Sequence, residues 1–471
     1  MPEPSTLSEA LARFALNLRF DEIPAEVVDK AKDVMLDTVG ICASSAPMDF
    51  GRSALALAHR LGGPPESSLI GFPATVAVHH AALANGVLAH GQDYDDTHTE
   101  SMVHAGAALV PAALALSEAT DASGRETLAA LIAGLEVSIR LGLPARNRFH
   151  LRGFHTTSIC CTFGAALMAA RMFGHEQAAA VDAAGVAGSL ASGLLECVPA
   201  GSGAKKLHAG WAASCGIQAA QFAQAGFTGP RTVFEGRLGV YNSLLRGEVP
   251  DLDEVLSGLG TRWEMLNIRP KLYPCCHYLQ TFIECAKSAR ADAAFDPDGI
   301  DRIECRIAAG AVNIVCDPWE KKLAPQTAYE ARFSLAFATA ITLINGSAGI
   351  SEFSDRYLGD ARLLALMKRV GYVVEPRFNV QDMQAGLAIV FHDGRRWERE
   401  MPRVRGDAAD PIDRDELLVK FRENVDQLNP ALGATVADAI VGLDGASDAG
   451  GLMRALSEAV PINLMRRSCH A

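Results

Sequence analysis

Residues 156–173 read TTSICCTFGAALMAARMF, in which apolar side chains recur at the spacing of one face of an α-helix. Alanine favours helix, and small side chains allow neighbouring helices to approach closely. The same pattern recurs outward from this stretch along the first 265 residues. We expect further helices from Thr6 or Ser8 to about Leu18, from Pro24 to about Ala43, and over 75–90, 105–120, 127–142, 176–195 and 207–226. This half of the chain is predicted to be a large all-helical bundle.

The pattern changes near Asn267. Residues 301–309, DRIECRIAA, alternate apolar and polar positions as a strand does. Within 385–401, AGLAIVFHDGRRWEREM, the pair Asp393-Gly394 separates two strand-like runs, a strong hairpin signal. Residues 328–345 lie between these strands and predict a helix ended by Gly346. We expect residues 267–403 to form a smaller α+β domain.

Helical periodicity returns after Pro411, over 414–425 and 450–460. We expect this tail to pack back on the first domain. The predicted fold is therefore mostly α, with a helical domain of residues 1–266 and 404–471. The α+β lid domain of residues 267–403 is inserted before the helical tail.

The composition limits the class of protein. A chain of 471 residues with 49% hydrophobic and 21% charged residues is too apolar to be disordered and long enough for two or three domains. Its net charge of −12 offers no overall basic field for nucleic acid or an anionic membrane. The sequence shows neither a secretory signal nor an apolar run of about 18 residues. The 11 cysteines, without any C-x-x-C, predict buried thiols and argue against structural zinc. A cytoplasmic protein is expected.

The most informative stretch for chemistry is residues 85–106, NGVLAHGQDYDDTHTESMVHAG, between two predicted helices. It gathers polar side chains on one connecting loop: His90, Asp93, Asp95, Asp96, Thr97, His98 and His104. A helix start attracts anions, and an imidazole placed there can act as acid or base. Two other interpretations remain open. Asp95, Asp96 and Thr97 could cap a helix, or His90, Asp93, His98 and His104 could bind a metal ion.

Cations lie in two further segments. In residues 196–210, ECVPAGSGAKKLHAG, Lys205 and Lys206 follow a glycine loop that enters a helix, which suits a carboxylate, although a solvated lysine pair is the alternative. In residues 267–278, NIRPKLYPCCHY, Arg269 and Lys271 flank a proline at the predicted domain boundary. They could be active-site cations or exposed charges on a hinge. His155 precedes another helix and could equally serve only as a helix-start residue.

Several segments together resemble the MmgE/PrpD family. The matching stretches, in the family's order, are LANGVLAHGQDYDDTHTESMVHAGAALVPAALALSEA, RGFHTTS, AKKLHAGWAASCGIQAAQFAQAGFTGPRTVFEGRLG, RPKLYPCCHYLQTFIE and EARFSLAFATAITLINGSAG. The resemblance covers most of the chain. It implies a helical domain, a smaller α+β lid domain and a homodimer. It also implies chemistry on small polycarboxylates at the cleft between the domains, without metal or cofactor.

The resemblance assigns site residues by position. Its acidic loop falls on Asp93 and Thr97, its two active-site histidines on His104 and His155, and its substrate-facing lysines on Lys205 and Lys271. Two positions depart from the family pattern. Ala105 stands where the family often has proline, and Phe337 where many members have tyrosine.

Both lines of reasoning lead to proton transfer at a carbon next to a carboxylate. His104 or His155 would move the proton, Asp93 would orient an imidazole, and Thr97, Lys205 and Lys271 would bind substrate carboxylates and spread developing charge. We expect a lyase, a decarboxylase or dehydratase, acting on a di- or tricarboxylate such as cis-aconitate or a citrate analogue. An epimerase or isomerase resembling iminodisuccinate epimerase, and a non-catalytic dimeric carboxylate-binding protein, are the alternatives.

Overall fold

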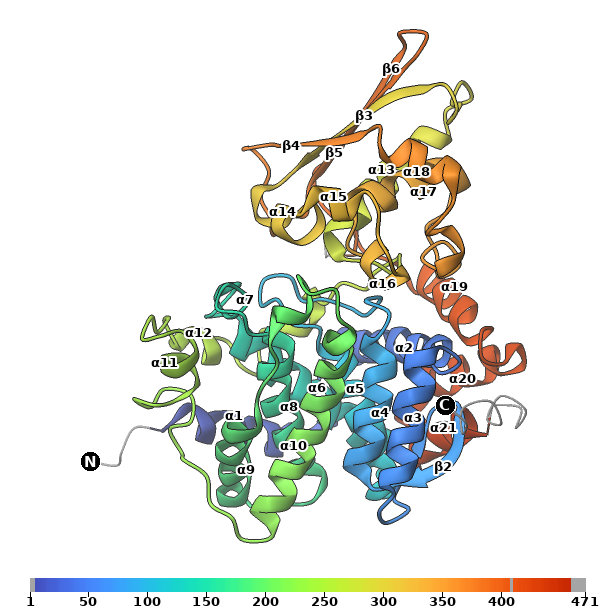
Figure 1. The fold of residues 1–471 in the computed structure, drawn as a ribbon. Coiled ribbons are helices and arrows are strands. Elements are labelled where there is room, and N and C mark those ends of the chain that lie inside the picture. The colour runs from blue at the N-terminus through green and yellow to red at the C-terminus, as the bar shows by residue number, and fades with distance from the viewer. Residues whose placement is uncertain (1–4, 407–409, 459–471) are drawn as a thin grey trace. The chain divides into compact units, whose positions relative to one another are not determined.

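The structure, a computed structural model, describes residues 5–406 and 410–458. These residues fall into two compact units, whose elements are labelled in Figure 1. The helical unit comprises the described residues up to Gly91, Asp95–Pro270 and those from Ile412 onward. The α+β unit comprises Gln92–Tyr94 and Lys271–Pro411.

The helical unit is built from helices of very different length, with one small hairpin. Its α-helices are α1 (Leu7–Asn17), α2 (Ala25–Ser45), α3 (Asp49–Leu61), α4 (Val78–His90), α5 (Ala105–Ala119), α6 (Gly124–Gly142), α7 (Arg148–Leu151), α8 (Thr156–Met172), α9 (Gln177–Leu190), α10 (His208–Gln224), α11 (Val240–Leu244), α12 (Asp253–Leu256), α19 (Arg414–Val425), α20 (Gly433–Val441) and α21 (Gly450–Ser457). Short 3-10 turns include η3 (Gly203–Leu207). The prediction of a mostly α fold is confirmed.

Glycines allow α4, α8 and α10 to cross closely. A Cβ atom on Gly86 would lie 2.5 Å from the Gly210 Cα, and one on Gly216 would lie 2.6 Å from the Thr162 carbonyl oxygen. Such separations are shorter than carbon side chains tolerate, so these crossings require glycine. The crossings fix the positions of the helix ends, which carry the polar side chains described below.

Two predicted helices differ from the observed ones. The helix expected from residue 75 begins only at Val78, because β2 (Phe72–Val76) pairs with β1 (Ser67–Leu69) in an antiparallel hairpin. The helix expected over 176–195 ends at Leu190. Gly193 then adopts φ 132°, a conformation open to glycine and incompatible with helix.

The α+β unit contains one four-stranded sheet. Its elements are α13 (His277–Arg290), β3 (Ile300–Ile307), α14 (Ala309–Val315), α15 (Trp319–Lys322), α16 (Ala328–Ala331), α17 (Leu335–Asn345), α18 (Ala361–Met367), β4 (Val370–Val374), β5 (Ala385–Phe391) and β6 (Arg396–Met401). The strand order is β4-β3-β5-β6, with β3–β4 parallel and the other pairs antiparallel. Helices α13 and α17 pack on the sheet (Figure 1). The predicted strand and Asp393-Gly394 hairpin are confirmed.

The helix predicted over 328–345 is interrupted. It divides into α16 and α17 because the Ser334 hydroxyl accepts a hydrogen bond from the Phe337 N–H and starts a new helix. Gly346, at φ 80°, ends α17 as predicted.

The chain after Ile412 belongs to the helical unit. Helix α19 packs against α2, where Lys420 Nζ lies 2.5 Å from Asp37 Oδ1 and Arg414 Nε lies 2.7 Å from Asp33 Oδ1. Helix α20 was not predicted. The predicted helix over 450–460 corresponds to α21, and its last two positions lie outside the described residues.

All ten cysteines within the described ranges are buried and form no disulfide, as predicted; Cys469 lies outside these ranges. Among the same residues, no helix combines the length and apolar character needed to cross a bilayer.

Candidate active site

Five histidines gather where helix ends of the helical unit meet. His90 ends α4, His104 and His155 precede α5 and α8, His208 begins α10, and His150 lies in α7. The ring of His155 lies 5.1–5.9 Å, centroid to centroid, from each of the other four. We call these five residues the histidine cluster. His104 and His155, predicted from separate sequence motifs, are thus neighbours.

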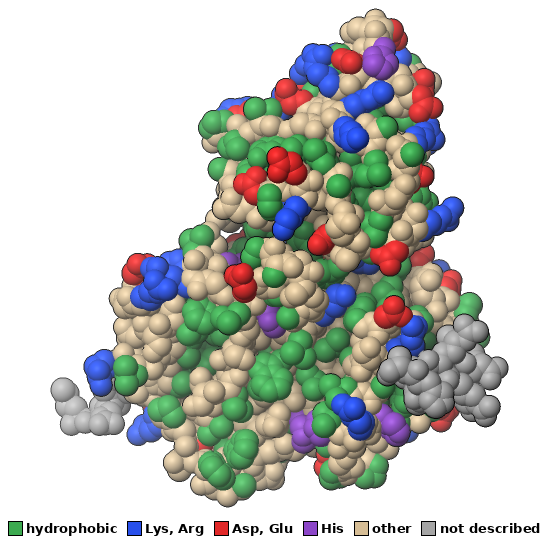
Figure 2. Space-filling model, in the orientation of Figure 1, with side chains coloured by type: hydrophobic (Ala, Val, Ile, Leu, Met, Phe, Trp, Pro, Cys, Tyr) green, Lys and Arg blue, Asp and Glu red, His purple; other side chains and the backbone are tan. Residues whose placement is uncertain are grey.

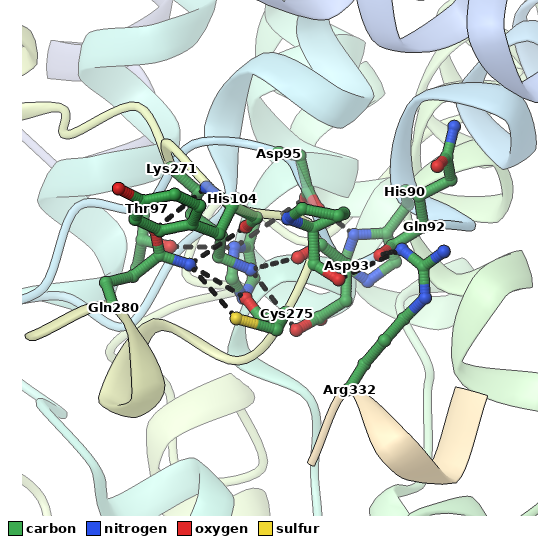
Figure 3. Close-up of polar contacts among 12 residues, drawn as sticks. His90, Gln92, Asp93, Asp95, Thr97, His104, Lys271, Cys275, Gln280 and Arg332 are labelled. Atoms are coloured by element: carbon green, nitrogen blue, oxygen red, sulfur yellow. Dashed lines mark hydrogen bonds and ion pairs between the residues drawn. The ribbon is translucent and has the colours of Figure 1, made fainter. Parts of the chain in front are cut away.

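The tautomer of His104 follows from its partners. Its Nδ1 lies 2.7 Å from the Asp96 carbonyl oxygen and 3.0 Å from the Thr97 hydroxyl (Figure 3). Because a carbonyl oxygen can only accept, Nδ1 carries the hydrogen, and in the neutral ring Nε2 carries the lone pair. His104 retains 13% of its side-chain exposure, which leaves it within reach of a ligand. These properties suit a proton-transfer residue.

His155 is held in place by a segment distant in sequence. Its backbone N–H donates to the Gly193 carbonyl oxygen over 2.9 Å, and its Nδ1 lies 3.1 Å from Nδ1 of His208. Burial first, and then the Lys205 cation and neighbouring imidazoles, hold the pKa of His155 well below its usual range. Burial, His90 and Lys205 likewise lower the pKa of His208 to about 4. Both rings are therefore neutral at pH 7.

The two adjacent lysines have different environments. Lys205 is buried and lowers the pKa of the neighbouring His150, His155 and His208. The Lys206 amine instead lies 4.6 Å from the centroid of the Phe50 ring. The alternative of a solvated pair is wrong for Lys205, which places a cation beside the histidine cluster.

Asp95 contacts two imidazoles of the histidine cluster. Its Oδ2 lies 2.6 Å from Nδ1 of His90 and 3.7 Å from Nδ1 of His104 (Figure 3). Asp93, the predicted orienting residue, pairs with Lys271 in the α+β unit. The sequence motif therefore led to the correct loop, but the spacing of three acidic residues could not show which carboxylate meets an imidazole.

Asp96 acts at the start of α5, as the capping interpretation proposed. Its Oδ1 accepts a hydrogen bond from the Gly106 N–H over 3.2 Å. A Cβ on Gly106 would lie 2.1 Å from Asp96 Oδ2, so the contact requires glycine. Burial and the nearby Asp37 and Asp95 raise the pKa of Asp96 to about 8.

In the α+β unit, Lys271 and Asp93 form a buried ion pair. Lys271 Nζ donates to the Asp93 carbonyl oxygen over 2.9 Å and lies 3.3 Å from its Oδ2 (Figure 3). Asp93 has φ 54°, in the left-handed region, where aspartate is tolerated. The Arg332 guanidinium donates to the Gln92 and Pro274 carbonyl oxygens and holds the preceding residue of the same segment. The hinge interpretation of Lys271 as an exposed charge is wrong, since only 1% of its surface is accessible.

The metal alternative finds little geometric support. His98 lies outside the histidine cluster, with Nδ1 2.9 Å from the Ser101 hydroxyl. Asp93 belongs to the other unit. Within residues 5–406 and 410–458, no group of three or more His, Cys, Asp or Glu side chains is arranged to hold a metal ion.

Sequence reasoning missed His150 and His208, and it placed His90 on the polar loop and among the candidate metal ligands without giving it a catalytic role. His208 could have been noticed, because it follows the lysine pair at a helix start. Arg269 has a partner on the acidic loop, since its Nη2 lies 3.2 Å from Glu100 Oε1. Of the two departures from the family pattern, Ala105 is buried in the first turn of α5 and Phe337 packs on Phe353 in the core of the α+β unit.

Comparison with known proteins identifies the family. Residues 9–253 match the MmgE/PrpD N-terminal domain and residues 273–440 the MmgE/PrpD C-terminal domain, so the chain belongs to the MmgE/PrpD family.

Curated relatives match over almost the whole chain. A cis-aconitate decarboxylase-like protein, oryM, of Aspergillus oryzae is 26% identical over 442 residues, 90% of this chain and 91% of the relative. A cis-aconitate decarboxylase of Aspergillus terreus is 24% identical over 476 residues, 96% of each chain. The cis-aconitate decarboxylase of Homo sapiens is 25% identical over 438 residues, 90% of this chain and 88% of the relative.

Proposed function

We propose that this protein is a lyase that acts on a small polycarboxylate, with decarboxylation of cis-aconitate as the first candidate reaction. The observation that carries this proposal is the histidine cluster beside the buried Lys205, in a family whose compared relatives are named cis-aconitate decarboxylases or decarboxylase-like proteins.

The reaction defines what the site must supply. In decarboxylation, the bond between a carbon and its carboxylate breaks, carbon dioxide leaves, and the electron pair remains on the substrate. A neighbouring double bond conjugated to a second carboxylate spreads this charge, and one proton then adds to carbon. The reaction needs a proton donor and nearby cations, which protein side chains can provide.

Within this proposal, His104 is the proton-transfer residue. Its Nδ1–H is fixed by the Asp96 carbonyl oxygen, so Nε2 exchanges the proton. The neutral His155 serves as a hydrogen-bonding or second proton-transfer group, and Lys205 stabilises the developing negative charge. Thr97, Lys271 and Asp93 are assigned to substrate binding and positioning.

Epimerisation of a dicarboxylate is a second candidate. An epimerase removes a proton from one face of a carbon and returns it to the other, which two separate groups can do. His104 and His155 begin different helices, and their rings lie 5.9 Å apart, so the cluster offers two such groups.

A homodimer is also proposed, through one apolar face of the helical unit. Trp211 and Phe222 lie on one side of α10 by helical spacing and are 38% and 41% exposed, and Leu207, at the end of η3, is 45% exposed. Figure 2 shows hydrophobic side chains gathered over the region where α10 lies in Figure 1. A second copy of the chain would remove this surface from water.

Incubation with candidate acids in deuterated water tests the function. cis-Aconitate, citrate analogues and chiral dicarboxylates are followed by nuclear magnetic resonance and mass spectrometry. Loss of carbon dioxide or water supports the lyase, whereas deuterium uptake with inversion and no loss of mass supports the epimerase. If no acid reacts but one raises the melting temperature, the protein is a carboxylate-binding protein and the proposal is wrong.

A further inference from the structure

One carboxylate oxygen of the helical unit serves two imidazoles. Oδ2 of Asp95 lies 2.6 Å from Nδ1 of His90 and 3.7 Å from Nδ1 of His104. Since an ionised carboxylate can only accept, His90 donates its Nδ1–H to this oxygen. This oxygen therefore links His90 to His104, the proposed proton-transfer residue.

His90 itself is enclosed. Its side chain has no exposed surface, and its Nε2 has no hydrogen-bond partner among the described residues. The His90 and His155 rings are stacked at 27° with centroids 5.4 Å apart. Asp95 connects His90 to His104 through its Oδ2 atom.

Charged groups are distributed unevenly around His90 and Asp95. The titratable and charged groups that face this pair are Asp37, Cys42, Asp96, His104, His155, Cys161, His208 and Lys205, with Lys30 and Lys420 beside Asp37 and Asp96. Burial and Lys205 lower the pKa of His155 and His208, so an additional proton is disfavoured on that side. The carboxylate of Asp95 lies on the other side, beside His90 and His104.

We propose that His90 and Asp95 are positioning residues that, together with His104, hold one shared proton and thereby set how much of His104 is ready to donate. This inference rests on the proposed function, because it assumes that His104 delivers the proton. Both Nδ1 atoms already carry a hydrogen, so an added proton goes to Nε2 of one ring or the other, and two protonated rings with centroids 5.4 Å apart repel each other. The pair therefore holds one added proton at a time.

Two substitutions should move the pH profile in opposite directions. Asp95→Asn removes the anion that favours the protonated ring. The pH above which kcat falls should then move down by roughly one to two units, with KM changed little. His90→Asn keeps an N–H donor for Asp95 but cannot take the proton, so His104 no longer shares it. The pH above which kcat falls should then move up by less than about one unit.

His98→Asn is the matched control, because His98 lies buried on the same loop but outside the histidine cluster. This substitution should leave the pH above which kcat falls unchanged. Structural damage alone would lower kcat at all pH values without opposite shifts. The proposal would be overturned if kcat fell above the same pH in the wild type and both variants, or if both variants shifted this pH in the same direction.

A measurement independent of turnover separates this proposal from the proposed function. Histidine labelled with ¹⁵N reports the protonation of each ring during a pH titration, with resonances assigned through His90→Asn and His104→Asn. The expected result is a coupled titration of His90 and His104 in the wild type, shifted to lower pH in Asp95→Asn. A His90 ring that titrates independently of His104, or is unaffected by Asp95→Asn, would refute the shared proton even in an active enzyme. If no acid is turned over yet the titration is coupled, the proposed function fails and the shared proton stands.

Discussion

The Nδ1 atoms of His155 and His208 lie 3.1 Å apart, so one ring donates its hydrogen and the other accepts it. The accepting ring must be neutral, because an imidazolium has no lone pair to offer. Burial and the Lys205 cation favour the neutral form of both rings. An additional proton is therefore disfavoured on His155 and His208. His90 and His104, by contrast, lie beside the Asp95 carboxylate.

The first prediction concerns stability in acid. The pKa of His208 falls from its usual 6.5 to about 4 in the folded protein, so below pH 6.5 the unfolded chain binds a proton that the folded chain does not. The free energy of unfolding should therefore decrease as pH falls from 6.5 to about 4, by up to about 1.4 kcal/mol per pH unit for each such histidine. His208→Asn should make this slope shallower in urea unfolding measured across the window. His59→Asn, on an exposed part of α3, is the control, and an equal slope in His208→Asn and the wild type would contradict the prediction.

The second prediction separates the two lysines. Lys205→Met removes the buried cation but keeps the aliphatic stem, and it should weaken binding of the unreactive tricarballylate by about 1.5–3 kcal/mol, roughly 10- to 150-fold in Kd. Lys206→Met removes the cation over the Phe50 ring and should change Kd little. Calorimetric titration of both variants decides the matter. Comparable losses of affinity would show that Lys205 has no special place in the site.

The third prediction follows from the buried pair of Lys271 and Asp93. Lys271→Met leaves the Asp93 carboxylate buried without this cation and should destabilise folding by about 3–5 kcal/mol, in addition to any loss of binding. Sequence reasoning alone predicts an effect mainly on binding. Asp93→Asn combined with Lys271→Met should recover part of the stability in a double-mutant cycle. Strictly additive destabilisation would show that the pair is not coupled.

The fourth prediction addresses assembly. Trp211→Glu places a charge on the exposed apolar face of α10 and should convert a dimer to a monomer in analytical ultracentrifugation. Val419→Glu, at an exposed position on α19, should leave the mass unchanged. A monomeric wild type, or a variant that stays dimeric, would exclude this face as the dimer interface.

Local sequence signals predicted most of the long helices because their apolar periodicity and caps lie within the helices themselves. Thr6 illustrates this: its hydroxyl accepts from the Glu9 N–H, while Glu9 accepts from the Thr6 N–H, and α1 begins at the next residue. The break before α17 depends on one hydroxyl, Ser334, within an otherwise helical pattern. Periodicity alone does not detect such a break.

Only part of the site was predicted from the sequence, because some of its contacts join residues that lie far apart in the chain. The acidic loop and His104 are visible as a local concentration of polar residues, but the approach of His155 to His208 joins positions 53 residues apart. That contact depends on how α8 and α10 cross, where Gly216 lies against Thr162. Sequence spacing contains no direct measure of this crossing, so His150 and His208 were missed, and the contacts of Asp95 with His90 and His104 were not predicted.

The fifth prediction tests the central claim, proton transfer by His104 in a polycarboxylate lyase. Asparagine at this position retains a donor near the Asp96 carbonyl oxygen but has no titratable ring. Turnover of cis-aconitate and melting temperature are measured on the same preparations of wild type and His104→Asn. We predict carbon dioxide release by the wild type, a decrease in kcat of about 10²–10⁴-fold in the variant, and a nearly unchanged melting temperature. A variant that melts at lower temperature but turns over at the wild-type rate would contradict the account and leave His104 a structural residue.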